Sequence, residues 1–145
     1  MTNNNSSSRR FRFLDAFPDP LSVKIIPKWE NNTNTVQATL LSPLKYNSHK
    51  YGEIIVPTGF ETDFASVPHF ARWYIDVVDP DILYPAIVHD WLYQNKGKIN
   101  ESLILSRKES DKVIKEAMHT VGAHNLKINI AYGAVRLGGW VAWNT

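Results

Sequence analysis

The chain contains no cysteine among its 145 residues. This absence excludes disulfide bonds, thiolate metal sites and a cysteine nucleophile. It fits a protein that folds in a reducing compartment, or a particle assembled in one. A chain of this length still forms a core without such links, because folding buries roughly 68 to 70% of the surface that the unfolded chain exposes.

The chain also lacks a large net charge. Its formal net charge is +2, and its basic residues are spread out apart from Arg9, Arg10 and Arg12. A nucleic-acid-binding domain normally carries a concentrated basic surface. We therefore expect no nucleic-acid partner.

A third absence is a long apolar run. No apolar segment of signal-peptide length follows a basic segment near the N-terminus, so no signal peptide is predicted. The most apolar segment, residues 126–143, contains Lys127 and Arg136. Since each charge costs about 2.5 to 3.5 kcal/mol at the centre of a bilayer, we interpret this segment as a buried helix and expect no transmembrane segment.

The first half of the chain is predicted to be rich in β-strands. Residues 1–10 are polar and low in complexity, which predicts a flexible tail, and residues 11–145 are expected to form a single domain. Short β-branched or aromatic segments, typical of strands, occur at residues 11–14, 21–26, 35–41 and 52–57. In the third segment, Val36, Ala38 and Leu40 alternate with polar residues, as in a strand with one buried face.

The second half changes to a helical period. Helices are predicted over residues 82–94, from Ser106 to Gly122, and from about Asn125 onwards. Pro85 is expected to delay or bend the first helix, and Ser106 with Glu109 forms a capping box at the start of the second. The prediction is an α+β fold, with N-terminal antiparallel strands followed by a three-helix C-terminal half.

A His-Asp pair inside the first of these helices provides a candidate site. His89 and Tyr93 are four residues apart and share a helix face, whereas Asp90 points about 100° away. Asp111 lies at the edge of the inward face of the next helix, so a helix hairpin would place it against His89. A carboxylate on one imidazole nitrogen fixes the tautomer and leaves the other nitrogen free as a general base. The alternative is a core histidine whose hydrogen bond to Asp111 holds two helices in register.

The words "HDWLY" and "ESDKVIKEAM" around these residues resemble the two catalytic helices of phospholipase A₂. The resemblance implies that His89 is the water-activating base, that Asp90 is a calcium ligand, and that Tyr93 and Asp111 orient the histidine. Nothing in the sequence reads as the glycine-rich calcium loop of that class.

The segment "PTGFETDFASVPHF", residues 57–70, supplies further candidates. A hard divalent cation such as calcium would take the carboxylate of Asp63 together with that of Asp90. Ser66 and His69 are secondary candidates in the same segment. Asp63 is equally suited to capping a local turn. Arg107 is a candidate substrate contact, although we favour its pairing with a carboxylate such as that of Asp111.

A longer resemblance covers most of the chain after residue 50. The words "GFETDFASVP", "AIVHDWLYQ", "SRKESDKVIKEAM" and "AYGAVRLGGW" occur in that order. This series resembles the phage and prophage family called domain of unknown function 1353. The resemblance implies a phage origin and a small α+β domain, and it leaves the reaction open.

Two classes of function follow. The first is a phage-encoded hydrolase that uses the His89–Asp111 dyad, assisted by a divalent cation, on an ester or amide. The second is a phage virion component of the tail, baseplate or connector, in which the dyad is structural and other virion proteins are partners. Either protein would be found in the host cytoplasm during infection or in the virion. A His-Asp phosphohydrolase and a Ser-His-Asp hydrolase are weaker alternatives, because strands open the chain and Ser66 lacks a G-x-S-x-G context.

Overall fold

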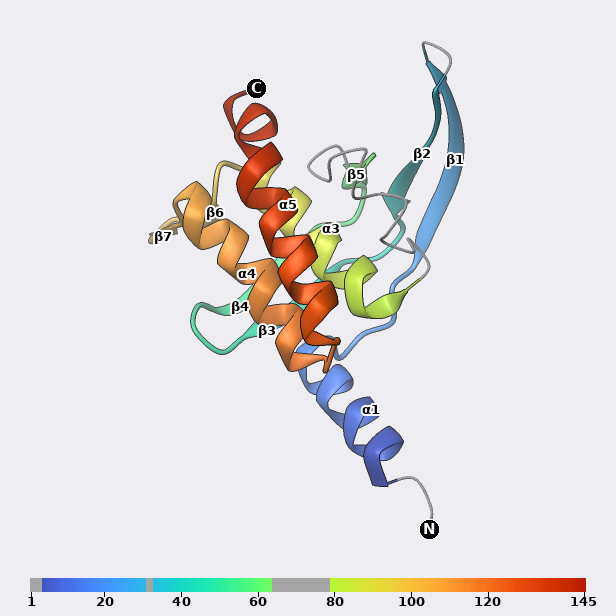
Figure 1. The fold of residues 1–145 in the computed structure, drawn as a ribbon. Helices are drawn as coiled ribbons and strands as arrows, with labels where there is room; N and C mark the ends of the chain where they lie inside the picture. The colour runs from blue at the N-terminus through green and yellow to red at the C-terminus, as the bar shows by residue number, and fades with distance from the viewer. Residues whose placement is uncertain (1–3, 31–32, 64–78) are drawn as a thin grey trace.

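The computed structural model describes residues 4–30, 33–63 and 79–145, with helices and strands arranged as in Figure 1. In chain order the elements are α1 (Asn4–Ala16), β1 (Val23–Glu30), β2 (Thr33–Leu40), β3 (Leu44–Ser48), β4 (Gly52–Val56), β5 (Glu61–Thr62), α3 (Pro80–Gln94), β6 (Lys98–Asn100), β7 (Leu103–Ile104), α4 (Arg107–Thr120) and α5 (Asn125–Asn144). The predicted α+β fold is confirmed, with antiparallel strands in the first half and α3, α4 and α5 in the second.

The strands form antiparallel hairpins. β1 pairs with β2 along its whole length, starting where Val23 lies opposite Leu40. β2 also pairs with β5, and β3 pairs with β4. The alternation predicted for β2 is present, since Ala38 and Leu40 are both buried. The β1–β2 hairpin extends well beyond this buried base and stands away from the helices in Figure 1.

All three predicted helix starts can be compared with the structure, and α5 begins at Asn125, as predicted. α3 begins at Pro80, earlier than Pro85 suggested, because Asp79 caps the helix and proline is suited to the first helical position. α4 begins after Ser106, as predicted. The capping box is complete: the backbone N–H of Glu109 donates to Ser106 Oγ, and that of Ser106 donates to Glu109 Oε2 at 2.8 Å.

The strand predicted for residues 11–14 is wrong, because these residues belong to α1. The helix also includes residues 4–10, for which we predicted a flexible tail. Phe13 and Phe17 lie at helical spacing and pack on one aromatic cluster. The ring of Phe17 stacks on Tyr46, with centroids 5.1 Å apart, and both phenylalanines meet Tyr84 edge-on. These contacts with aromatic rings far along the chain favour the helix. A local sequence pattern does not show such contacts.

The polar loop predicted between the second-half helices contains a small hairpin, β6–β7. Gly97 adopts a φ of 77° at its start, and a Cβ there would lie 1.9 Å from the carbonyl oxygen of Leu105. The backbone N–H of Leu105 donates to the carbonyl of Gly97 at 2.9 Å. This close return of the chain requires glycine.

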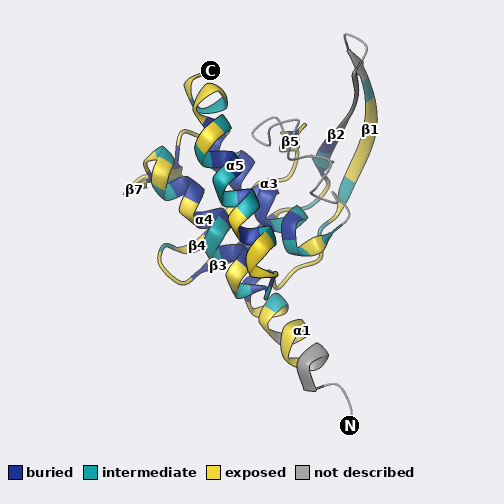
Figure 2. Ribbon diagram, viewed as in Figure 1, coloured by how far each residue is buried: buried dark blue, intermediate teal, exposed yellow. Residues whose placement is uncertain are grey.

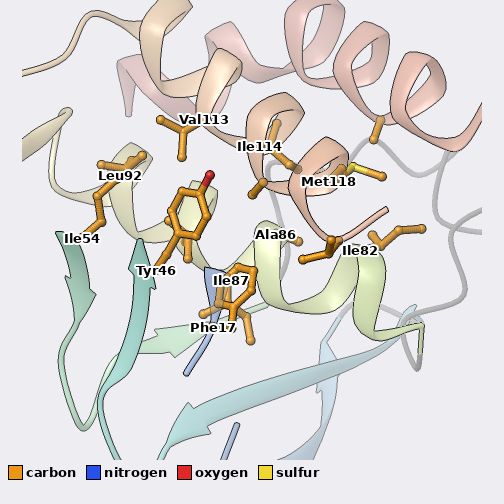
Figure 3. Packing of buried hydrophobic residues seen from close by; sticks show 14 of the residues in the cluster. Phe17, Tyr46, Ile54, Ile82, Ala86, Ile87, Leu92, Val113, Ile114 and Met118 are labelled. Atoms are coloured by element: carbon orange, nitrogen blue, oxygen red, sulfur yellow. The ribbon is translucent and has the colours of Figure 1, made fainter. Parts of the chain in front are cut away.

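The core lies between the helices and the β3–β4 hairpin. Figure 3 shows side chains of α3 and α4, among them Leu92, Val113 and Ile114, turned toward Tyr46 and Ile54 of the hairpin. Figure 2 shows buried residues concentrated where α3, α4 and α5 meet. Within residues 4–30, 33–63 and 79–145, none of the helices has both the length and the apolar character that crossing a membrane requires.

Candidate functional site

His89 and Asp111 lie against each other in the core, as the helix periods predicted. The Nε2 atom of His89, on α3, is 2.8 Å from Oδ1 of Asp111, on α4. The side chains are 1% and 0% exposed, respectively. An ionisable pair at this depth is tolerated only when each member is hydrogen-bonded to the other or to further partners.

Asp111 accepts hydrogen bonds from side chains of α3 and α5 and forms a further ion pair within α4. The hydroxyl of Tyr93, on α3, donates to Oδ1 at 2.5 Å. On the other oxygen, Oδ2, the Nη1 group of Arg136 donates at 2.5 Å from α5, and the Nη1 atom of Arg107 lies 3.5 Å away. Arg107 therefore pairs with this carboxylate, as the favoured interpretation held. α3, α4 and α5 converge on one carboxyl group.

These contacts keep Asp111 ionised. Burial alone raises the pKa of Asp111, but the hydrogen bonds from His89, Tyr93 and Arg136 outweigh it and hold the pKa below its ordinary value. Burial and the same carboxylate raise the pKa of Tyr93, so its phenol remains a neutral donor. The hydrogen bond to Asp111 raises the pKa of Arg136 in turn.

An ionised Asp111 determines the tautomer of His89. Because the carboxylate only accepts hydrogen bonds, Nε2 must carry the proton and Nδ1 the lone pair in the neutral ring. His89 is thus arranged as a base. Its proton-accepting atom, Nδ1, makes no hydrogen bond with the residues that the structure describes.

Asp90 occupies a separate buried position beside the dyad. Asp90 is 5% exposed as a residue, and the hydroxyl of Thr62 on β5 donates to its Oδ2. The side-chain amide of Gln94 also donates to the Glu61 carbonyl at 3.1 Å, so β5 is tied to α3 at two points. Asp63, an exposed residue, follows Thr62 directly.

The predicted cation site lies only partly within the described residues. Across the described residues, no group of three His, Asp or Glu side chains gathers in the way a metal ion requires. Calcium takes six to eight oxygen ligands, and Asp90 with Asp63 would supply only part of that number. A calcium site here would need oxygen ligands besides these two carboxylates. The remaining candidates, Ser66 and His69, lie outside the described residues.

Comparison with known proteins identifies the family of this chain. Residues 38–135 match the family model described as "Protein of unknown function (DUF1353)". The chain belongs to the DUF1353 family. No curated protein and no solved structure matches it. The DUF1353 match contains both members of the dyad as well as Tyr93 and Thr62, whereas Arg136 lies just beyond it.

Two contacts of this DUF1353 chain were not predicted from its sequence. A Cβ on Gly139 would lie 2.4 Å from the hydroxyl oxygen of Tyr93, so α5 packs directly against Tyr93 at this residue. The only feature of the sequence that pointed to this close contact was the set of small residues in the last helix. Thr62 was missed because a donor to a buried carboxylate shows no local pattern, although it directly precedes the candidate Asp63.

Proposed function

We propose that this chain is a phage-encoded hydrolase in which His89 activates water for attack on an ester or amide. One observation carries the proposal: the ionised carboxylate of Asp111 holds Nε2 of His89 at 2.8 Å, so that the lone pair is on Nδ1. The resemblance of "HDWLY" and "ESDKVIKEAM" to the catalytic helices of phospholipase A₂ supports the same assignment.

The proposed chemistry is general-base catalysis. Nδ1 of His89 takes a proton from water as the water oxygen bonds to the carbonyl carbon of the substrate. The imidazolium that forms is stabilised by the carboxylate of Asp111, which Tyr93 and Arg136 hold in place. The proton then passes from Nδ1 to the leaving oxygen or nitrogen as its bond to carbon breaks.

Asp90 and Asp63 remain the proposed contacts for a divalent cation such as calcium. A cation held there would supply positive charge near the substrate. No step of the proposed reaction passes through it, because two carboxylates alone do not complete a calcium site.

The test is hydrolysis of lipid, model-ester, amide and phosphoester substrates by the wild type and by His89→Asn, each with and without calcium. Removal of a general base is expected to lower the rate by about 10²- to 10⁴-fold. His119→Asn is the matched control, since His119 is an exposed histidine on α4. Rates at the level of buffer for wild type and His89→Asn alike, across all four substrate classes, would leave the enzymatic proposal without support.

A second role is supported by the burial of the dyad. With exposed fractions of 1% and 0%, His89 and Asp111 resemble a core contact that sets the register of α3 and α4. The chain would then be a virion component of the tail, baseplate or connector. This role predicts that His89→Asn lowers the melting temperature and impairs particle assembly together. Retained stability with lost infectivity would argue against it, and mass spectrometry of purified virions tests its location.

A further inference from the structure

α5 is apolar on the face that points away from the core as well as on the face that packs. The buried side contains Ile128, Ala131, Ala134, Val135 and Gly139. On the opposite side, Leu137 is 77% exposed, Trp140 58%, and Leu126 and Val141 53% each. Exposed segments recur along α5 in Figure 2. A helix that is apolar all round is normally covered on all sides.

No charged side chain lies on this uncovered side. α5 contains only two charged residues, Lys127 and Arg136. Both lie on its flanks and are bound within the chain, Lys127 to Asp79 and Arg136 to Asp111. A surface helix usually carries charges opposite its packed face, so a continuous apolar strip such as this one indicates an interaction surface.

The spacing along the strip matches a helical partner. We define the outer face of α5 as Leu126, Ile130, Gly133, Leu137, Trp140 and Val141. Its first five members recur at alternating intervals of four and three residues, the repeat by which two helices pack side by side. The strip therefore fits another helix better than a flat or extended partner.

The distribution of side-chain size suits a second copy of α5 running in the opposite direction. Gly133 lies near the middle of the helix, and a Cβ there would meet nothing within 4 Å, so a second backbone can approach closely. Antiparallel pairing about this point sets Leu126 opposite Trp140 and Ile130 beside Leu137. Each half of the strip then faces a complementary half.

The available area is sufficient for such a pair. A helix of 20 residues is about 30 Å long and offers on the order of 500 Å² on one face. Two copies would then bury about 1,000 Å² in total, the lower limit for a specific interface. We propose that the outer face of α5 binds the same face of a second copy of this chain, antiparallel and crossing at Gly133, to form a two-fold dimer.

Sedimentation velocity across a concentration series tests the dimer. The wild type is expected to shift from monomer to dimer with concentration, and Leu137→Glu to raise the dissociation constant by about tenfold or more, because a charge would be buried in the contact. Ile104→Glu is the matched control: Ile104 is 66% exposed but lies on β7, so this variant should dimerise like the wild type.

Disulfide crosslinking tests the orientation, since the natural chain has no cysteine. In an antiparallel pair Gly133→Cys faces itself and should crosslink on oxidation. Leu126→Cys should not, because the two copies of residue 126 would be about 21 Å apart along the helix axis. Crosslinking of Leu126→Cys would overturn the antiparallel arrangement.

Three results would overturn the dimer. The first is a wild type that stays monomeric at its highest soluble concentration. The second is a dimer that Leu137→Glu leaves unchanged. The third is a monomer that sediments with phosphatidylglycerol vesicles and loses this binding on Leu137→Glu, which would assign the outer face to a lipid surface instead.

Discussion

Asp111 is the residue on which the most interactions depend. A buried carboxylate without partners would be strongly destabilising, but here both oxygens are engaged, by His89 and Tyr93 on one side and by two arginines on the other. The same contacts that make the charge tolerable also orient His89. The same network therefore stabilises the fold and fixes the His89 tautomer that has its lone pair on Nδ1. For this reason activity and unfolding have to be measured on the same variants.

Asp111→Asn is expected to lower the free energy of unfolding near neutral pH by about 2 to 3 kcal/mol, since it removes a charge that several donors share. It should also alter the pH dependence. Because the folded-state pKa of Asp111 is depressed, its contribution is complete above the ordinary carboxyl pKa of about 3.9 and is lost as the pH falls through the lower folded value.

Urea unfolding at about pH 6 and about pH 3 checks this pH dependence. The wild type should lose more stability between the two pH values than Asp111→Asn does. Asp15→Asn is the control, because Asp15 is exposed. An equal loss in the wild type and in Asp111→Asn would show that the network does not depress the pKa of Asp111.

Among the elements, α5 has three glycines, and two of them, Gly133 and Gly139, lie in opposite surroundings. At Gly139 the Tyr93 hydroxyl and ring leave no room for a Cβ, whereas a Cβ on Gly133 would meet nothing within 4 Å. Glycine normally weakens a helix interior relative to alanine. One of these glycines is thus required by packing in the folded monomer and the other is not.

Gly139→Ala and Gly133→Ala should therefore change stability in opposite directions. Overpacking against Tyr93 is expected to cost about 1 to 3 kcal/mol at residue 139. At residue 133 the greater helix propensity of alanine should add up to about 1 kcal/mol. Thermal unfolding of both variants at one low protein concentration measures the difference, and a stabilising Gly139→Ala would contradict the close packing of α5 on α3.

The start of α4 depends on a local motif, so its contribution can be measured separately. Ser106→Ala removes the side-chain acceptor for the backbone N–H of Glu109 and should lower the free energy of unfolding by about 1 kcal/mol. Chemical denaturation provides the measurement. Ser102→Ala, in the exposed turn between β6 and β7, is expected to change stability by less than about 0.5 kcal/mol; equal effects would indicate that the cap is not formed in solution.

At the scale of the whole molecule, α1 is joined to the domain by aromatic contacts across long chain distances. Phe17 is 1% exposed and packs on Tyr46 and Tyr84. Its contacts connect a segment outside the DUF1353 match, residues 38–135, to residues within it. Phe17 is part of the hydrophobic core, as expected for a residue of the predicted domain over residues 11–145.

Phe17→Ala is expected to destabilise the protein by about 3 to 5 kcal/mol, the usual cost of removing a buried aromatic ring. Leu14→Ala, at a position 46% exposed on the same segment, should have a much smaller effect. Urea unfolding of both variants provides the comparison. A small effect of Phe17→Ala would mean that α1 does not dock on the domain in solution.

The dyad could be predicted because it follows from local periods. His89 and Tyr93 share a helix face by their spacing, and the capping box at Ser106 sets the register of Asp111 in the next helix. Gly139 and Thr62 could not be assigned in the same way. Their roles depend on which residue of another element reaches them, and chain spacing does not contain that information.

The sequence by itself determined the α+β order, the second-half helices and the residues of the His-Asp hairpin, since periodicity and capping act within a few residues of the chain. Tertiary structure alone decided that α1 is a helix beside the docked Phe17, that Gly139 packs on Tyr93, and that the dyad lies below the surface. These outcomes depend on burial and on contacts between distant segments, where desolvation and packing outweigh local preference.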